Sequence, residues 1–190
     1  MRKTFLILFL LLPLIFFTAC ERPDYEDEII KIYREAKTEK KETSGIVIDG
    51  RMWSKPSENE LSWDNAVEYC KKLKEIGHSD WHLPTINELR TLMRNCPNTE
   101  PGGLCNLTDE CLEEEISSGY TSPYSECRSS DCGCIPDYKD EGLYSKLWDT
   151  VVLWSSSEAG NPEYAASAYF GYGKLWIEHK STTRNVRCVR

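Results

Sequence analysis

Residues 80–89 of the chain read Asp80-Trp81-His82-Leu83-Pro84-Thr85-Ile86-Asn87-Glu88-Leu89. Thr85 and Glu88 form a capping-box pattern, in which each side chain accepts a hydrogen bond from the other residue's free backbone amide. Apolar residues then recur at helical spacing, at Ile86, Leu89, Leu92 and Met93. The pattern predicts a helix that begins after Thr85 and buries one face.

A hairpin and another helix are expected before this stretch. Residues 46–48 and 51–53 lie on either side of Asp49-Gly50, a dipeptide that favours a type I′ hairpin turn. The helix is expected to run from its N-cap, Ser62, to Gly77, which suits a C-terminal cap. Its apolar residues recur at steps of three and four and are Trp63, Ala66, Val67, Cys70 and Leu73. Cys70 is therefore expected on a buried face.

The remainder divides into a long irregular region and a series of short strands. Residues 95–145 show no periodicity and hold six cysteines, so we expect loops that need cross-links. Short β-like runs follow, separated by Gly, Pro and Asn, at residues 151–157, 165–170, 174–179 and 185–190. The predicted order is hairpin, helix, helix, cross-linked loops and meander.

Length and composition narrow the class of protein. The chain has 190 residues, 40% hydrophobic and 11% aromatic, which suits one domain with a core and excludes a wholly disordered chain. Its formal net charge is −8, so we expect no nucleic-acid partner. Nine cysteines is an odd number and a high content, which is typical of an exported protein with one unpaired cysteine.

The N-terminus predicts which cysteine is unpaired. Arg2 and Lys3 precede an apolar run at residues 5–17, which is typical of an export signal and too short for a membrane span. Phe17-Thr18-Ala19-Cys20 resembles the lipobox of bacterial lipoproteins, so we expect residues 1–19 to be a signal peptide and Cys20 to carry lipid. The alternative is a secretory peptide cut nearby, with Cys20 an ordinary thiol.

The mature chain is expected to consist of an anchor, a tether and one domain. Residues 20–44 are assigned to the lipidated cysteine and a solvated tether, because residues 21–44 mix eight acids with six bases. The globular domain is assigned to residues 45–190. Loss of Arg2 and Lys3 leaves 21 basic and 31 acidic residues, a net charge of −10. The expected location is the bacterial cell envelope, with the membrane leaflet left open.

Four segments together carry a family resemblance: Trp63-x-x-Ala66-x-x-Tyr69-Cys70-x-x-Leu73, Asp80-Trp81-His82-Leu83-Pro84-Thr85-x-x-Glu88-Leu89, Leu153-Trp154-Ser155-Ser156-Ser157 and Val186-Arg187-Cys188-Val189-Arg190. In this order and spacing they resemble the Lcl C-terminal domain family, found at the C-terminus of bacterial collagen-like adhesins. They are also similar to the Fibrobacter major paralogous domain. The resemblance covers residues 45–190, and His82 stands where the family usually has arginine.

The resemblance implies an α+β, C-type-lectin-like fold with two helices, a small antiparallel sheet and a long disulfide-rich loop region. It also implies that the N- and C-terminal strands are brought together and that Cys70 pairs with Cys188. Some family members are reported to bind sulfated polysaccharides, which the net charge of −10 opposes over the chain as a whole.

The six remaining cysteines are Cys96, Cys105, Cys111, Cys127, Cys132 and Cys134. They allow fifteen pairings, among which the sequence does not choose. Zinc is the alternative, but their spacing lacks the paired C-x₂-C knuckles of structural zinc sites. We therefore expect three disulfides, and no metal or cofactor.

Other polar clusters favour structural roles over chemical ones. His78, Ser79 and Asp80 are adjacent, but members of a catalytic triad meet in space and need no adjacency, so we expect a polar turn and no catalysis. An acidic run could hold calcium loosely, although a solvated acidic face is the favoured interpretation. Its members are Asp109, Glu110, Glu113, Glu114 and Glu115.

Aromatic and basic residues interleave near the C-terminus, at Tyr169, Tyr172, Lys174, Trp176, His179, Lys180 and Arg184. Because side chains alternate along a strand, Lys174, Trp176 and Glu178 should share one face, and Leu175 and Ile177 the other. Trp176 is either an exposed platform for a sugar ring or a core residue. The candidate ligand-binding residues are Tyr172, Lys174, Trp176, Lys180 and Arg184.

Three functions are compatible with this pattern. The favoured hypothesis is a non-enzymatic, lipid-anchored adhesion or binding module whose partners are the membrane and a glycan or a surface protein. The second is an enzyme on a scaffold like that of the formylglycine-generating group, which would require free reactive cysteines. The third is a purely structural envelope lipoprotein. The oligomeric state is left open.

Overall fold

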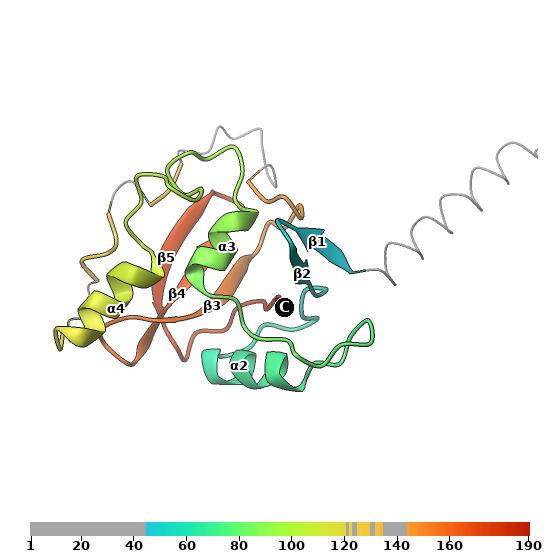
Figure 1. Cartoon of the computed structure of the whole chain (residues 1–190). Coiled ribbons are helices and arrows are strands. Elements are labelled where there is room, and N and C mark those ends of the chain that lie inside the picture. Colours follow the sequence, from blue (N-terminus) through green and yellow to red (C-terminus); the bar gives the residue numbers. More distant parts are fainter. Residues whose placement is uncertain (1–44, 121, 123–124, 130–131, 135–143) are drawn as a thin grey trace, which may run out of the picture. The chain divides into compact units, whose positions relative to one another are not determined.

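The computed structural model describes residues 45–120, 122, 125–129, 132–134 and 144–190. The expected signal peptide, Cys20 and the tether lie outside these residues. The described part is an α+β domain, which confirms the predicted class, and the lectin-like topology remains an expectation from the resemblance (Figure 1). Its elements are β1 (Ile46–Ile48), β2 (Arg51–Trp53), α2 (Trp63–Lys72), α3 (Ile86–Leu92), α4 (Asp109–Ser117), β3 (Val152–Glu158), β4 (Tyr164–Tyr169) and β5 (Lys174–His179).

The N-terminal hairpin forms as predicted. β1 and β2 pair antiparallel, with Ile46 opposite Trp53 and Ile48 opposite Arg51. Asp49 and Gly50 between them have φ values of 49° and 79°. Two consecutive positive φ values define the type I′ turn, whose twist matches that of the strands it joins.

The first expected helix is shorter than predicted. α2 begins after Ser62 and buries Ala66 and Cys70, but it ends at Lys72 instead of reaching Gly77. Ile76 and Gly77 have φ values of 55° and 76° and form a second tight turn, which hydrogen bonds between Glu75 and His78 close. Gly77 is therefore a turn residue and not the helix cap.

The second expected helix, α3, has the predicted capping box. The hydroxyl of Thr85 accepts a hydrogen bond from the amide of Glu88 (3.2 Å), and the Glu88 carboxylate accepts one from the amide of Thr85 (2.9 Å). Ile86, Leu89 and Leu92 are fully buried. The apolar stripe predicted from the sequence thus faces the core.

A third helix, α4, lies in the region expected to be irregular, so the prediction of two helices is wrong. Thr108 caps it by accepting a hydrogen bond from the amide of Cys111 (3.3 Å). Its apolar stripe is too narrow to predict, because Leu112 is buried but Ile116 is exposed. A disulfide from Cys111 attaches this helix in place of a wider apolar face.

The C-terminal half forms a three-stranded antiparallel sheet in the order β3-β4-β5, as three of the four predicted runs required. The fourth run, residues 185–190, is not a regular strand. It pairs through isolated bridges, Asn185 with Leu153 and Val189 with both Trp53 and His82, because its partners change along its length. The first and last segments of the domain are nevertheless joined, since Met52 of β2 and Arg190 exchange two backbone hydrogen bonds of 3.0 Å.

Apolar clusters pack against both faces of this sheet. On one face, Leu175 and Ile177 pack with the buried residues of α3, which lies in front of the sheet in Figure 1, and with Leu112 of α4. On the other, Trp154 and Ala165 pack with Ala66 and Cys70 of α2. The second cluster covers only part of its face, and this leaves room for a groove.

The eight cysteines of the domain form four disulfides: Cys70–Cys188, Cys96–Cys134, Cys105–Cys132 and Cys111–Cys127. The first joins α2 to the C-terminal segment, which is the pairing that the resemblance implies. The other three are nested one inside another within residues 96–134, which we call the stapled segment. The spacing of the six cysteines does not select this nested arrangement among the fifteen possible pairings.

Candidate ligand-binding groove

A groove of about 400 Å³ lies on the part of the sheet that the α2 cluster leaves uncovered. Its wall consists of Val152, Ser167, Tyr169, Tyr172, Lys174, Trp176, Glu178 and Arg184. Residues paired across antiparallel strands point to the same face, and the register pairs Lys174 with Tyr169 and Trp176 with Ser167. We call this surface the sheet groove, and its volume is in the range of small-molecule sites.

Aromatic rings form one side of the sheet groove. Tyr169 and Tyr172 pack edge to face, with ring centroids 4.7 Å apart. Trp176 keeps 38% of its surface exposed, whereas its neighbours Leu175 and Ile177 are buried. Trp176 is therefore a surface residue and not a core residue, and the predicted alternation along β5 is present.

An ion pair forms the polar side of the sheet groove. Arg184 donates two hydrogen bonds to the Glu178 carboxylate, one of them from Nε at 2.9 Å. This hydrogen bonding raises the pKa of Arg184 above its ordinary value. The hydroxyl of Ser167 donates to the same carboxylate at 3.0 Å, so the three side chains hold one another in place.

A further cation contacts the aromatic side from outside the groove wall. The guanidinium of Arg128, in the stapled segment, lies 3.5 Å from the centroid of the Trp176 ring. The segment also borders β5 directly, because the carbonyl of Cys132 accepts a hydrogen bond from the amide of Leu175 (3.0 Å). The edge of the sheet and its groove are thus bounded by the cross-linked loops.

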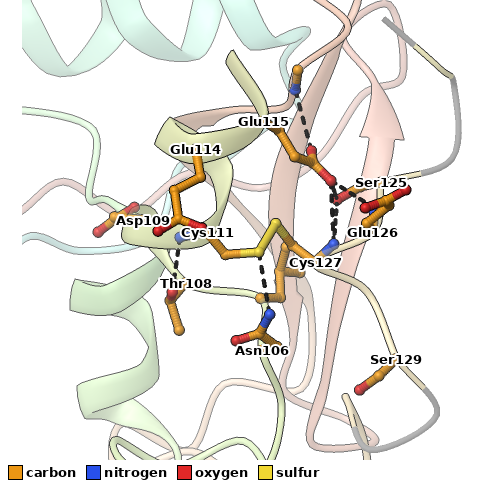
Figure 2. Close-up of a disulfide and its surroundings, with 12 residues drawn as sticks. Asn106, Thr108, Asp109, Cys111, Glu114, Glu115, Ser125, Glu126, Cys127 and Ser129 are labelled. Carbon is orange, nitrogen blue, oxygen red and sulfur yellow. Dashed lines mark hydrogen bonds between the residues drawn. A yellow bond between two sulfur atoms is a disulfide. The ribbon is translucent and has the colours of Figure 1, made fainter. Parts of the chain in front are cut away.

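The loop that carries Arg128 has a buried acidic anchor, shown in Figure 2. The Glu115 carboxylate accepts hydrogen bonds from the Ser125 hydroxyl (2.9 Å) and from the amides of Glu126 (2.6 Å) and Cys127 (3.2 Å). The Cys111–Cys127 disulfide fixes the same loop to α4 (Figure 2). Two independent attachments therefore precede Arg128 in the chain.

This anchor corrects part of the interpretation of the acidic run, in which Glu110, Glu113 and Glu114 are exposed as expected. Glu115 is only 7% exposed and contacts backbone amides, so it is not part of a solvated face. Asp109 accepts hydrogen bonds from Ser157 and from the amide of Asn87, which links α4 to β3 and α3. Within the described residues, no group of three or more His, Cys, Asp or Glu is placed to hold a metal ion.

Four of the five candidate ligand residues meet in the sheet groove: Tyr172, Lys174, Trp176 and Arg184. Lys180 does not, because its ammonium bonds the Glu158 carboxylate and lies 4.0 Å from the Trp63 ring centroid. Val152 and Ser167 were not among the predicted residues, because their side chains reach the groove only through the strand register. Arg128 was not predicted either, because the sequence carries no signal for it.

Two partly exposed ion pairs lie near the start of α3, one between His82 and Glu88 and the other between Arg190 and Asp80. His82 bonds the Glu88 carboxylate at 3.2 Å, and this hydrogen bond raises the pKa of His82. Arg190 donates to Asp80 at 2.8 Å and thereby lowers the pKa of that carboxyl group. The contact between Arg190 and Asp80 joins the C-terminal segment of the domain to the residues before α3.

Comparison with known families places most of the chain in a described family. A family model described as the Lcl C-terminal domain matches residues 47–190, which is most of the chain and nearly all of the domain. No curated protein matches the sequence. Among the described residues, no helix is both long enough and apolar enough to cross a membrane.

Proposed function

Because the chain belongs to the Lcl C-terminal domain family, we propose that it is a non-enzymatic binding or adhesion module of the bacterial cell envelope. The family is compatible with an adhesin-like module. Within that class, we propose that the sheet groove is the ligand site and that its ligand is a glycan.

The observation that carries this proposal is the composition of the sheet groove. Three aromatic side chains, Tyr169, Tyr172 and Trp176, share it with the hydrogen-bonded pair Arg184 and Glu178. The face of an aromatic ring is electron-rich and attracts the C–H groups of a sugar ring, while fixed polar groups can bond its hydroxyls. A surface with both features side by side suits a glycan better than a purely apolar ligand.

The disulfides favour binding over catalysis. An enzyme of the formylglycine-generating type would need free cysteines, and all eight cysteines of the described domain are paired. A count of free thiols in the denatured mature protein tests this point. A count of zero would support the binding module, whereas a count of two would favour the enzyme hypothesis.

The lipid anchor is a separate part of the proposal. Cys20 follows an export-signal pattern, and acyl chains on that residue would hold the module at the membrane. Cys20→Ala should abolish metabolic labelling with a fatty-acid analogue. Label that persists in this variant would rule out lipidation at Cys20.

Glycan binding is tested by probing a broad array of neutral and acidic glycans with the detergent-solubilised full chain. We expect binding that resists added salt and that Trp176→Ala reduces at least tenfold. Trp148→Ala is the matched control, since Trp148 is also exposed and also stacks with an arginine but does not line the groove. Failure of the wild-type chain to bind any glycan would favour a purely structural lipoprotein.

A further inference from the structure

The contact between Arg128 and Trp176 joins the stapled segment, which its own disulfides cross-link, to strand β5, which has no cysteine. Trp176 projects from β5, whereas Arg128 belongs to the stapled segment and follows Cys127 directly. The guanidinium lies 3.5 Å from the ring centroid, well within the range of a cation–π interaction. The side chain of Trp176 is thus held by a residue outside its own sheet.

Arg128 contacts the indole without occupying the groove. Trp176 lines the sheet groove, whereas Arg128 is not among the residues of its wall. In the arrangement inferred here, the ligand contacts the part of the indole that faces the groove, and Arg128 stays stacked on the ring. An exposed tryptophan on a strand can otherwise exchange between rotamers, which would cost binding energy when a ligand orders it. A guanidinium packed on the ring favours the rotamer that forms the groove wall.

The position of Arg128 is set by the anchors of its loop. Cys127 is fully buried, its sulfur is bonded to Cys111, and its amide donates to the Glu115 carboxylate. Figure 2 shows the Glu115 carboxylate bonded to Ser125, Glu126 and Cys127, and the disulfide from Cys111 ending at Cys127. Because Cys127 is held at both its sulfur and its amide, the backbone position of Arg128, the next residue, is restrained.

We propose that Arg128 is a positioning residue of the sheet groove: it holds the Trp176 indole in the orientation that binds ligand, and α4 holds Arg128 through Glu115 and the Cys111–Cys127 disulfide. The consequence for binding rests on the proposed glycan function. The positioning itself is a property of the free protein and is tested without ligand.

The test uses ¹⁹F NMR of the full chain in detergent, with its six tryptophans replaced by 5-fluorotryptophan. Trp176→Phe assigns the Trp176 signal. We expect Arg128→Ala to move that signal and to increase its solvent isotope shift between H₂O and D₂O. Arg128→Lys should restore most of the original signal, because an ammonium also interacts with the ring face.

Arg94→Ala is the matched control, because Arg94 stacks on Trp148 at 4.0 Å. It should move the Trp148 signal and leave that of Trp176 in place. A Trp176 signal that is unchanged in Arg128→Ala, or that moves equally in Arg94→Ala, would overturn the proposal.

Binding supplies a second measurement. For the tightest glycan of the array, Arg128→Ala should weaken affinity about fivefold, the effect of one exposed cation–π contact. If no glycan binds, the proposed function fails while the spectroscopic result still decides the role of Arg128. Unchanged affinity together with a displaced Trp176 signal would show that the orientation of Trp176 does not matter for binding, and would overturn the consequence drawn here.

Discussion

The scaffold and the stapled segment of this domain are held together by different physical means. The scaffold, residues 45–95 and 144–190, packs apolar clusters against both faces of a sheet and uses one disulfide to join distant parts of the chain. The stapled segment, residues 96–134, has three nested disulfides and a short helix. Both regions contribute to the main apolar cluster, the stapled segment through Leu107 and Leu112, but the segment also carries three of the four disulfides.

Two buried charged side chains, Arg90 and Glu115, form hydrogen bonds with the backbone of the stapled segment. Arg90 of α3 donates from its guanidinium to the backbone carbonyls of Thr99, Glu100 and Leu107, and burial lowers the pKa of Arg90. The Glu115 carboxylate, conversely, accepts hydrogen bonds from the backbone amides of Glu126 and Cys127. One guanidinium and one carboxylate thus satisfy polar backbone that the loops would otherwise bury without partners. These hydrogen bonds give the polar segment a defined conformation. The segment then contacts the wall of the sheet groove through Arg128, which stacks on Trp176.

The largest expected effect compares the disulfides of the two regions. Cys70–Cys188 closes a separation of 118 residues and Cys111–Cys127 one of 16. The chain-entropy model then assigns about 5 kcal/mol of unfolding free energy to the first and about 3 kcal/mol to the second. Urea unfolding of the double variants Cys70→Ser/Cys188→Ser and Cys111→Ser/Cys127→Ser measures the difference. An equal or larger loss in the second variant would break the distinction between scaffold and segment.

An intermediate effect is expected from the buried carboxylate of the stapled segment. Glu115→Gln keeps the shape of the side chain but removes the charge that three backbone or hydroxyl donors share, which should cost about 2 kcal/mol. Hydrogen exchange should locate the loss. The amides of Glu126 and Cys127 should exchange faster, while those of β4 stay protected. Glu114→Gln, one position away on the same helix, is the control and should leave both sets unchanged.

The smallest effect belongs to an ion pair on the scaffold surface. The hydrogen bond from Glu88 raises the pKa of His82, and hydrogen bonds from His82 and from the Thr85 amide outweigh burial and lower the pKa of Glu88. The contribution of His82 is complete below its ordinary pKa of about 6.5 and is lost as pH rises through the raised folded value. The contribution of Glu88 is lost as pH falls through its lowered folded value. The side chain of His82 is half exposed, so the pair should stabilise by less than about 1 kcal/mol.

An NMR pH titration of His82 checks this estimate. Glu88→Gln retains a side chain that can complete the capping box but removes the charge, so the pKa of His82 should fall toward its ordinary value. Glu68→Gln, which removes an exposed carboxylate paired with Lys72, should leave the His82 titration unchanged. A pKa of His82 that is insensitive to Glu88→Gln would show that another group sets it.

Much of the scaffold could be predicted from local sequence. The Asp49-Gly50 turn and the Thr85 and Glu88 capping box are short-range chemical patterns, and both form as expected. α4 could not be predicted, because a disulfide and a buried glutamate replace most of its apolar stripe. The regular strand predicted at residues 185–190 does not form, because the bridges of this segment depend on partners that are distant in sequence.

The residues of the candidate site also differ in whether local sequence predicts them. Alternation along β5 predicts that Lys174 and Trp176 share one face, but it does not decide whether that face is exposed or buried. Lys180 lies beyond the end of that strand, where alternation no longer applies, and it turns to Glu158 instead. Arg128 reaches Trp176 only because the stapled segment is folded against β5, and neither its sequence position nor its neighbours indicate that contact.

The sheet groove as a glycan site is the central claim, and one titration tests it most directly. The tightest glycan of the array is added to the 5-fluorotryptophan-labelled full chain, and the ¹⁹F signals of Trp176 and Trp148 are followed together. We predict that the Trp176 signal shifts to saturation with a single dissociation constant while the Trp148 signal stays in place. A glycan that binds to saturation and leaves the Trp176 signal unmoved would contradict the assignment of the sheet groove as the ligand site.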